Sequence, residues 1–256
     1  MGRIAVFDSG LGSLTIIKAI QKNTKADIIY FADQKNFPYG GKSKAELEQI
    51  IKNTINGLKN KFNPDLIVIG SNTPSLLLNK FINNDPRLIG VLPPLSLAQK
   101  ITKTNSIALL VTQSVAKSSA LNNFIKANLT SKIKVSKINS SELVELVESA
   151  KFIYDKDFCI RKIISTLQTI FIKNNIDTAT LSSTHLPFLF PLLQKIFPNV
   201  TFLDPADAVA KQIIKNKMFV PSSKNTLKIF TSGNVKTFHN HLQKIGIHNS
   251  VQKLIL

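Results

Sequence analysis

Two serines stand directly after apolar runs that are typical of buried strands. Ser71 follows the run DLIVIG, Ser183 follows DTATLS, and the two positions are 112 residues apart. Each run reads Asp, four strand-like residues, a small residue and then Ser. In open α/β sheets, ligands bind beyond the carboxyl ends of the strands. The serines could therefore act in chemistry, by losing a proton to a neighbouring base, or could only cap the helices that follow.

Further polar side chains follow both serines. Asn72 and Thr73 come after the first of them, and Thr184 and His185 come after the second. Free backbone N–H groups at the start of a helix favour a bound carboxylate. These residues are therefore candidates for holding an acidic ligand. Simple capping, and a structural role for the histidine, are the alternatives that the sequence leaves open.

The first two strands also end in candidate loops. Asp8 and Ser9 open the Gly-rich turn DSGLGS, which has neither the Walker pattern nor the full dinucleotide fingerprint. A carboxylate there suits an ammonium group or proton transfer better than a phosphate, and a local turn or cap is the alternative. The second strand leads to Pro38, Tyr39 and Gly40, a turn whose backbone N–H groups could grip a carboxylate.

Short apolar runs alternate with amphipathic segments along the chain, which is typical of βα units and a parallel sheet. One amphipathic segment, residues 42–62, is predicted as a helix with Ser43 as its N-cap and Glu46 three residues later. The predicted strands are Arg3–Phe7, Ala26–Phe31, Asp65–Ile69, Leu88–Val91, Ser106–Val111, Ile133–Val135, Thr178–Ser182, Val200–Phe202 and Leu227–Thr231.

The matching strand ends predict an internal duplication. Besides the two serine runs, IAVFDSG at Ile4 and IALLVTQS at Ile107 begin alike. We therefore predict an α/β protein with two similar three-layer α/β lobes, whose parallel-type sheets face each other across a central cleft. The first lobe is predicted to comprise residues 1–95 plus 210–256, and the second residues 96–209.

Composition narrows the class of protein. The 256 residues are 43% hydrophobic, which is enough to bury a large core. Cys159 is the single cysteine, so no disulfide closes within the chain and a secreted, cross-linked fold is not expected. No apolar stretch has the length of a signal or membrane segment. We predict a cytoplasmic protein.

The formal net charge of +18 favours acidic partners. Arg3, Arg87 and Arg161 are the only arginines, so lysine, which is poorer at bidentate phosphate contacts, supplies most of the charge. The lysines are spread along the chain without a dense run. This pattern favours a generic solvated surface, with weak nucleic-acid association as the alternative and no membrane partner.

The loops together resemble the aspartate/glutamate racemase family, and glutamate racemases in particular. The matching motifs are FDSGLGSL, DQKNFPYG, SNTPS, LVTQSVAKS, LVELVES, SSTHLP and FLDPADAVA, and they occur in the family's order between about residues 3 and 210. The resemblance implies two α/β lobes that hold glutamate or aspartate, no cofactor and no metal. Family members often dimerise, so a homodimer is also open.

The resemblance assigns roles to individual positions. In this family two cysteines, one in each lobe, exchange the proton at the α-carbon of the amino acid, and the matching positions here are Ser71 and Ser183. Asp8 and Glu148 match acidic residues that assist the cysteines, and His185 matches the histidine beside the second cysteine. The positions that match substrate-holding residues are Ser9, Pro38, Tyr39, Gly40, Asn72, Thr73, Thr112 and Thr184.

Serine is a far weaker acid than cysteine. A thiol has a pKa of about 8.5, whereas the pKa of a hydroxyl lies far above it and close to that of water, a gap on the order of 10 kcal/mol. A racemase needs a base that removes a proton from carbon, so Ser71 and Ser183 make a poor pair. We expect very low or absent activity, with Asp8, Glu148 or His185 as substitute bases for any that remains.

Two origins of the serines stay open. Natural divergence is favoured because Gly70, Pro74 and Ser182 also depart from the family's pattern, while deliberate replacement of cysteine to trap a substrate is the alternative. A non-catalytic sensor of an acidic metabolite and a nucleic-acid-associated protein are the other functions considered. A serine hydrolase using His185 is remote because no Gly-x-Ser-x-Gly elbow is present.

Overall fold

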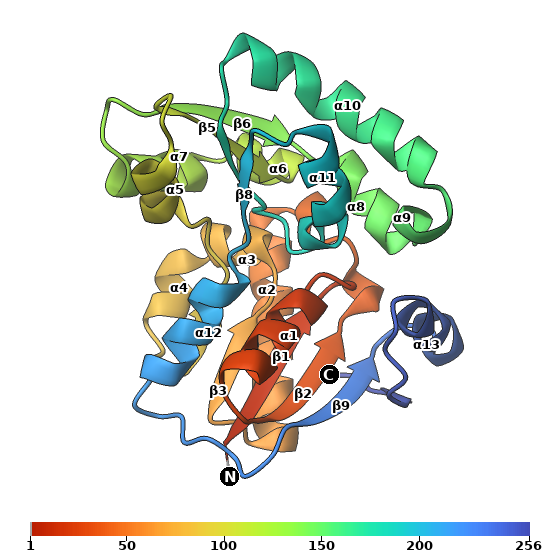
Figure 1. Cartoon of the computed structure of the whole chain (residues 1–256). Helices are drawn as coiled ribbons and strands as arrows, with labels where there is room; N and C mark the ends of the chain where they lie inside the picture. The colour runs from red at the N-terminus through yellow and green to blue at the C-terminus, as the bar shows by residue number, and fades with distance from the viewer. Residues whose placement is uncertain (1) are drawn as a thin grey trace. The chain divides into compact units, whose positions relative to one another are not determined.

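The computed structural model describes residues 2–256, which form two compact units (Figure 1). Unit 1 contains the chain up to Val91 together with Ala206–Leu256, and unit 2 contains Leu92–Pro205. The chain therefore leaves unit 1 once and returns to it. None of the helices within residues 2–256 is long and apolar enough to cross a membrane.

Unit 1 contains a six-stranded parallel sheet in the order β10-β9-β2-β1-β3-β4. The register places Ile4 opposite Ile28 of β2 and Leu66 of β3, so the three central strands end level with one another. The strands are β1 (Arg3–Asp8), β2 (Asp27–Ala32), β3 (Leu66–Ile69), β4 (Leu88–Gly90), β9 (Thr226–Thr231) and β10 (Val251–Lys253).

Helices cover both faces of this sheet because its strands are apolar on both sides. Alternate strand residues such as Phe7, Ile29 and Ile67 pack in one core cluster with Leu47 and Ile51 of the long helix α2. Helices α1 and α12 pack against each other on the other face (Figure 1). The helical elements are α1 (Leu14–Asn23), η1 (Gln34–Asn36), η2 (Tyr39–Gly41), α2 (Lys44–Phe62), α3 (Asn72–Leu77), α4 (Asn79–Asn83), α12 (Ala206–Lys215) and α13 (Val235–Lys244).

Unit 2 contains a four-stranded parallel sheet in the order β6-β5-β7-β8. Its core joins alternate strand residues such as Ala108 and Leu110 to Leu143 and Ile163. The strands are β5 (Ser106–Val111), β6 (Lys134–Asn139), β7 (Thr178–Thr180) and β8 (Thr201–Leu203). The helical elements are α5 (Leu95–Ile101), α6 (Gln113–Ala116), α7 (Ser119–Asn128), α8 (Ser141–Glu148), α9 (Lys151–Tyr154), α10 (Lys156–Lys173), η3 (Leu186–Leu189) and α11 (Phe190–Ile196).

The two units repeat one arrangement of strands. The order β2-β1-β3-β4 in unit 1 corresponds to β6-β5-β7-β8 in unit 2. The two matching aspartates also make similar contacts: Asp65 accepts a hydrogen bond from Arg3 N at 2.7 Å, and Asp177 accepts bonds from the backbone N–H groups of Lys103 and Thr104. Each aspartate thus binds backbone at or just before the start of a central strand, which explains why the sequence match includes it.

The predicted α/β class and parallel sheets are confirmed, but the strand predicted over Thr178–Ser182 ends at Thr180, and two other strands depart further from prediction. The sixth strand begins at Lys134 and extends to Asn139, because an exposed edge strand with the sequence KVSKIN lacks the apolar run that marks buried strands. Strand β10 was not predicted, since it has only three residues and two of them are exposed. The predicted cap of α2 is confirmed: Ser43 Oγ accepts a hydrogen bond from Glu46 N at 3.2 Å.

Candidate functional site

Asp8 and Ser9 lie at the carboxyl end of the central strand β1 of unit 1. Both are buried, with exposed fractions of 1% and 4%, and Asp8 Oδ1 accepts a hydrogen bond from Ser9 N at 2.6 Å. The hydroxyl of Tyr30 donates to the carbonyl of Gly10 and so fastens the turn that follows. The structure thus places a buried carboxylate at the sheet edge where a ligand is expected.

Tyr39 belongs to the loop after β2, and its hydroxyl is hydrogen-bonded within that loop. It donates to Asp33 Oδ2 at 3.0 Å, and burial, with the carboxylates of Asp33 and Asp8, raises the pKa of Tyr39 well above its ordinary value of 10.0. The neighbouring Pro38 carbonyl accepts a bond from Gly41 N at 3.1 Å. Tyr39 could therefore contribute to a ligand site through its backbone, whereas its hydroxyl supports the loop.

Ser71 occupies the N-cap position of α3, but its side chain does not cap the helix. Ser75 binds this turn instead: its Oγ donates to the Ser71 carbonyl at 2.6 Å and accepts from Val91 N at 2.9 Å. The Ser71 hydroxyl has no hydrogen bond partner among residues 2–256. The capping alternative is therefore wrong for Ser71, which keeps a free hydroxyl at the strand end.

Asn72 presents an unsatisfied acceptor at the same strand end. Its Nδ2 donates to the Val91 carbonyl at 2.9 Å, while its Oδ1 is buried and has no hydrogen bond partner among the described residues. Asn72 and Thr73 are both 3% exposed. A buried acceptor without a partner costs about 1–3 kcal/mol. A ligand that donates a hydrogen bond, such as one with an ammonium group, would satisfy it.

The corresponding strand ends of unit 2 carry Thr112, Ser183 and Thr184. The last two are buried, at 6% and 3% exposed, while the Thr112 hydroxyl lies 3.3 Å from Ser114 Oγ. The hydroxyl of Ser183 makes no hydrogen bond to any described residue. The turn before it is fastened by a 2.6 Å contact between Thr180 Oγ1 and Ser182 Oγ. Ser183 therefore resembles Ser71 in having an unused hydroxyl after a central strand.

Glu148 and His185, which are 37 residues apart, are brought into contact in unit 2. Glu148 Oε1, at the end of α8, lies 2.5 Å from His185 Nε2, just before η3. Both side chains are largely buried, at 14% and 7% exposed. The contact orients the imidazole two residues after Ser183. These predicted residues thus form one hydrogen-bonded pair.

Cys159, the one thiol of the chain, lies away from these strand ends. It is on the buried face of α10, inside the core of unit 2 and 0% exposed. Burial, with the nearby Asp155 carboxylate, raises the pKa of the thiol. A buried, less acidic thiol is unsuited to proton transfer at a ligand.

Asp33 is a buried residue of this region that the sequence reasoning missed. Its carboxylate accepts the hydrogen bond from the Tyr39 hydroxyl described above. It accepts two more, from Asn36 Nδ2 at 2.8 Å and from Ser232 Oγ at 3.0 Å. It therefore joins the loop after β2 to the end of β9. Its position just after a predicted strand, like that of Asp8, could have identified it from the sequence.

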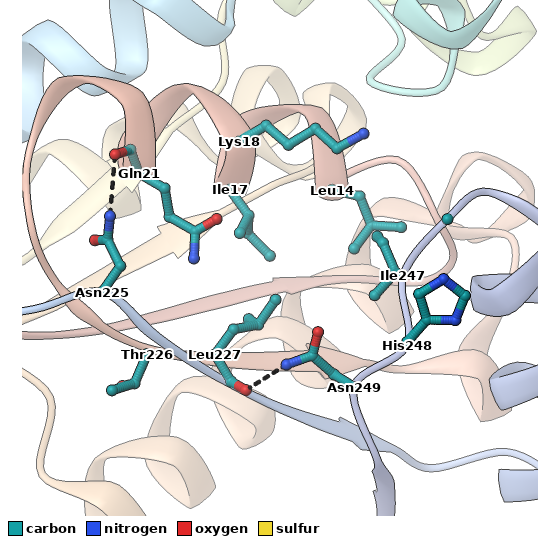
Figure 2. A pocket seen from close by; sticks show the side chains of 11 residues that line it. Leu14, Ile17, Lys18, Gln21, Asn225, Thr226, Leu227, Ile247, His248 and Asn249 are labelled. Carbon is teal, nitrogen blue, oxygen red and sulfur yellow. Dashed lines mark hydrogen bonds between the residues drawn. The ribbon is translucent and has the colours of Figure 1, made fainter.

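A separate groove of about 600 Å³ lies in unit 1 between α1, β9 and the segment before β10 (Figure 2). Its polar side chains include Gln21 and His248. The side-chain amides of its two asparagines are hydrogen-bonded: Asn225 Nδ2 donates to the Gln21 carbonyl and Asn249 Nδ2 to the Leu227 carbonyl, both at 3.1 Å. None of the predicted site residues lines this groove. It is distinct from the strand-end site.

Two parallel sheets with a repeated strand order and buried polar residues at their strand ends define an α/β protein of two related units. No protein-family model matches the sequence. The glutamate racemase of Bartonella quintana is 30% identical over 258 residues, covering 94% of this chain and 93% of that protein. The chain therefore belongs to the aspartate/glutamate racemase family, as a homologue of glutamate racemases.

Solved structures of this family have the same fold. A glutamate racemase of Bacillus anthracis superposes with a TM-score of 0.85 at 26% identity, covering 100% of this chain and 98% of the other. The Escherichia coli glutamate racemase, solved with L-glutamate and an activator, gives a TM-score of 0.83 at 23% identity and covers 99% of this chain and 98% of the other. The predicted resemblance is thus confirmed.

Proposed function

We propose that this protein binds an acidic amino acid, glutamate or aspartate, and that its racemase activity is very low or absent. The observation that carries the proposal is that Ser71 and Ser183 occupy both positions where the family has cysteines. The binding residues are retained while the two acid–base groups are changed. We therefore expect this chain to bind the amino acid while racemising it very slowly or not at all.

Binding is supported by the polar groups of unit 1. The buried Oδ1 of Asn72 lacks a donor, and the buried carboxylate of Asp8 suits a cation. An amino acid supplies an ammonium group that can donate a hydrogen bond to Asn72 Oδ1. The homologous Escherichia coli protein was solved with L-glutamate, which makes glutamate the first ligand to test.

Weak catalysis follows from the chemistry of the residues present. The hydroxyls of Ser71 and Ser183 lack a hydrogen-bonded base among the described residues, so nothing compensates for their low acidity. The histidine nearest in sequence to Ser183 is held by Glu148 through its Nε2 atom. Cys159 is buried in the core of unit 2 and cannot replace either lost thiol.

Titration calorimetry with L- and D-glutamate and with L-aspartate tests the binding half of the proposal. We expect saturable heat with at least one of them, and Asn72→Ala should weaken it by roughly tenfold, the value of about one hydrogen bond to a charged group. Asn83→Ala, which changes an exposed asparagine on α4, is the matched control. No heat with any of the three ligands would contradict the binding proposal.

A binding protein without turnover would also fit a sensor of an acidic metabolite. That alternative predicts the same calorimetric result and no exchange of the α-proton. A nucleic-acid role predicts instead binding to duplex DNA that falls steeply as salt rises. Calorimetry, α-proton exchange and DNA binding together separate an enzyme, a sensor and a nucleic-acid-binding protein.

A further inference from the structure

The loop Asn216–Asn225 joins α12 to β9 and lies along the edge of the unit 1 sheet at which the strands begin (Figure 1). Besides the bonds of Asn225 at its end, three hydrogen bonds join it to backbone carbonyls at this edge. Ser222 N donates to the Lys25 carbonyl at 2.8 Å, Ser222 Oγ donates to the Gly2 carbonyl at 3.0 Å, and Asn216 Nδ2 donates to the Pro86 carbonyl at 2.8 Å. These acceptors precede β2, β1 and β4, so the loop is at the opposite sheet edge from the candidate site.

This loop holds apolar side chains in solvent. Phe219 is buried, whereas its neighbours Met218 and Val220 are 46% and 67% exposed. A Cβ at Gly2 would lie 2.8 Å from the Phe219 ring and 1.9 Å from the Val220 carbonyl oxygen, so the loop is packed closely on the chain. Phe219 and the Val220 backbone therefore pack against the start of β1, while the Met218 and Val220 side chains are exposed. Together with Ile214 they are three of the ten exposed large apolar residues in the described chain.

Four exposed lysines belong to this loop, to the residue directly before it or to the residues that it contacts. Lys215 and Lys217 lie between Ile214 and Met218, and Lys25 and Lys224 flank the Ser222 anchor. None of the four forms an ion pair with any residue in the described part of the chain. We call Met218, Val220 and these four lysines the basal patch.

The acidic residues near the basal patch are already engaged. Asp27 is paired with Arg3 at 2.7 Å, and Asp85 contacts both Lys59 and Arg87. Asp65 accepts the backbone bond from Arg3 N. On α12 the acidic residue is Asp207, in the first turn, whereas Lys215 is in the last. The patch therefore keeps its positive charge.

The combination of lysine and apolar residues selects among anionic partners. A nucleic acid would use the lysines but would gain little from exposed Met218 and Val220, and the patch has neither arginine nor an exposed aromatic ring for base contacts. A second copy of the chain would bring like charges together. An anionic lipid surface uses both kinds of side chain, because lysines bind headgroups while apolar side chains enter the interface.

We propose that the basal patch of unit 1 docks reversibly on anionic lipid membranes. The proposal departs from the sequence-based prediction of no membrane partner, because the exposure of Met218 and Val220 cannot be deduced from the sequence. The docking edge lies away from Asp8 and Ser71, so ligand binding and membrane docking are separate properties of the chain.

Flotation with phosphatidylcholine vesicles that contain phosphatidylserine tests the proposal. We expect the full chain to float with these vesicles and not with phosphatidylcholine alone. Lys215→Gln with Lys217→Gln should weaken partitioning by about fivefold for each lysine. Met218→Ser with Val220→Ser should weaken it by at least about tenfold, from the lost apolar burial.

A matched control comes from unit 2. Ile172, which is 72% exposed, and the adjacent Lys173 end α10, and Ile172→Ser with Lys173→Gln should leave partitioning unchanged. Because the chain contains no tryptophan, Met218→Trp provides a reporter whose emission should shift to the blue on anionic vesicles only. Circular dichroism verifies that each variant is folded.

Three results would overturn the proposal. The first is a wild-type chain that does not float with anionic vesicles. The second is flotation that both pairs of basal-patch substitutions leave unchanged. The third is duplex-DNA binding that the lysine changes reduce and the Met218 and Val220 changes do not, without vesicle binding, which would assign the patch to nucleic acid.

Discussion

Glu148 Oε1 lies 2.5 Å from His185 Nε2, and this contact joins the end of α8 to the turn after β7 in unit 2. Both side chains are largely buried. The pair fixes the orientation of the imidazole next to Ser183 and Thr184, which are also buried. The Glu148–His185 contact therefore holds one candidate side chain of unit 2 in a defined orientation.

Loss of this contact should destabilise the protein. Glu148→Ala leaves a buried ring nitrogen without its partner, and we expect the free energy of unfolding to fall by about 1–3 kcal/mol. Urea denaturation followed by circular dichroism measures the change. Glu145→Ala removes an exposed carboxylate from the same helix and should have little effect. Equal stability of the two variants would show that the pair contributes nothing.

A methyl group at Gly70 should not fit. A Cβ there would lie 1.9 Å from Ser13 Oγ and 2.8 Å from Ser13 Cβ, so Gly70→Ala should lower the free energy of unfolding by about 1–3 kcal/mol. The same change in a Ser13→Gly background should cost less, because both clashing atoms are gone. Gly41→Ala, whose nearest neighbour is 3.8 Å away, is the control. A double-mutant cycle without coupling would refute this explanation.

Acid should weaken unit 1 through Asp85. Burial raises the pKa of this carboxyl, but hydrogen bonds from Lys59 and Arg87 outweigh burial and lower the pKa from 3.8 to about 2. Because the folded-state pKa lies below the unfolded one, the stabilisation is complete above pH 3.8 and is lost as the pH falls through about 2.

Asp85→Asn should therefore reduce the difference in stability between neutral and acidic pH. The carboxylate is partly exposed, so we expect a change on the order of 1–2 kcal/mol. Urea denaturation of both proteins at several pH values measures it. Asp207→Asn, at an exposed position of α12, is the control. An unchanged pH profile in Asp85→Asn would contradict the assignment.

Much of the fold could be predicted because local pattern and burial agree in the central strands. The apolar run that follows Asp65 forms the buried strand β3. Helix α2 begins directly after Ser43, its predicted N-cap. The short strand β10 and the extension of β6 escaped prediction, because edge strands with exposed polar residues carry little periodic signal.

The candidate site was predictable in its residues and less so in their roles. Strand ends indicated Ser71 and Asn72, yet only the structure shows that Ser75 fastens the turn at Ser71, and that the Tyr39 hydroxyl is bound to Asp33. Such contacts depend on tertiary packing and cannot be deduced from spacing in one sequence. That Ser71 and Ser183 stand where the family has cysteines is what the resemblance implies, and it stays a prediction.

Restoring the thiols should restore activity if the rest of the site is intact. Ser71→Cys together with Ser183→Cys replaces two hydroxyls by thiols, whose pKa is far lower. We expect racemisation of glutamate or aspartate, measured by circular dichroism, to rise by orders of magnitude in the double variant. Each single variant should gain far less, because transfer needs two groups. No gain in a folded, ligand-binding double variant would mean that other residues are also lost.

Exchange of the α-proton in D₂O, followed by NMR with each enantiomer of glutamate and aspartate, tests the central claim most directly. The account predicts exchange that is orders of magnitude slower than in a two-cysteine relative measured under the same conditions. Rapid exchange by the protein with Ser71 and Ser183 in place would contradict it and would require a different base.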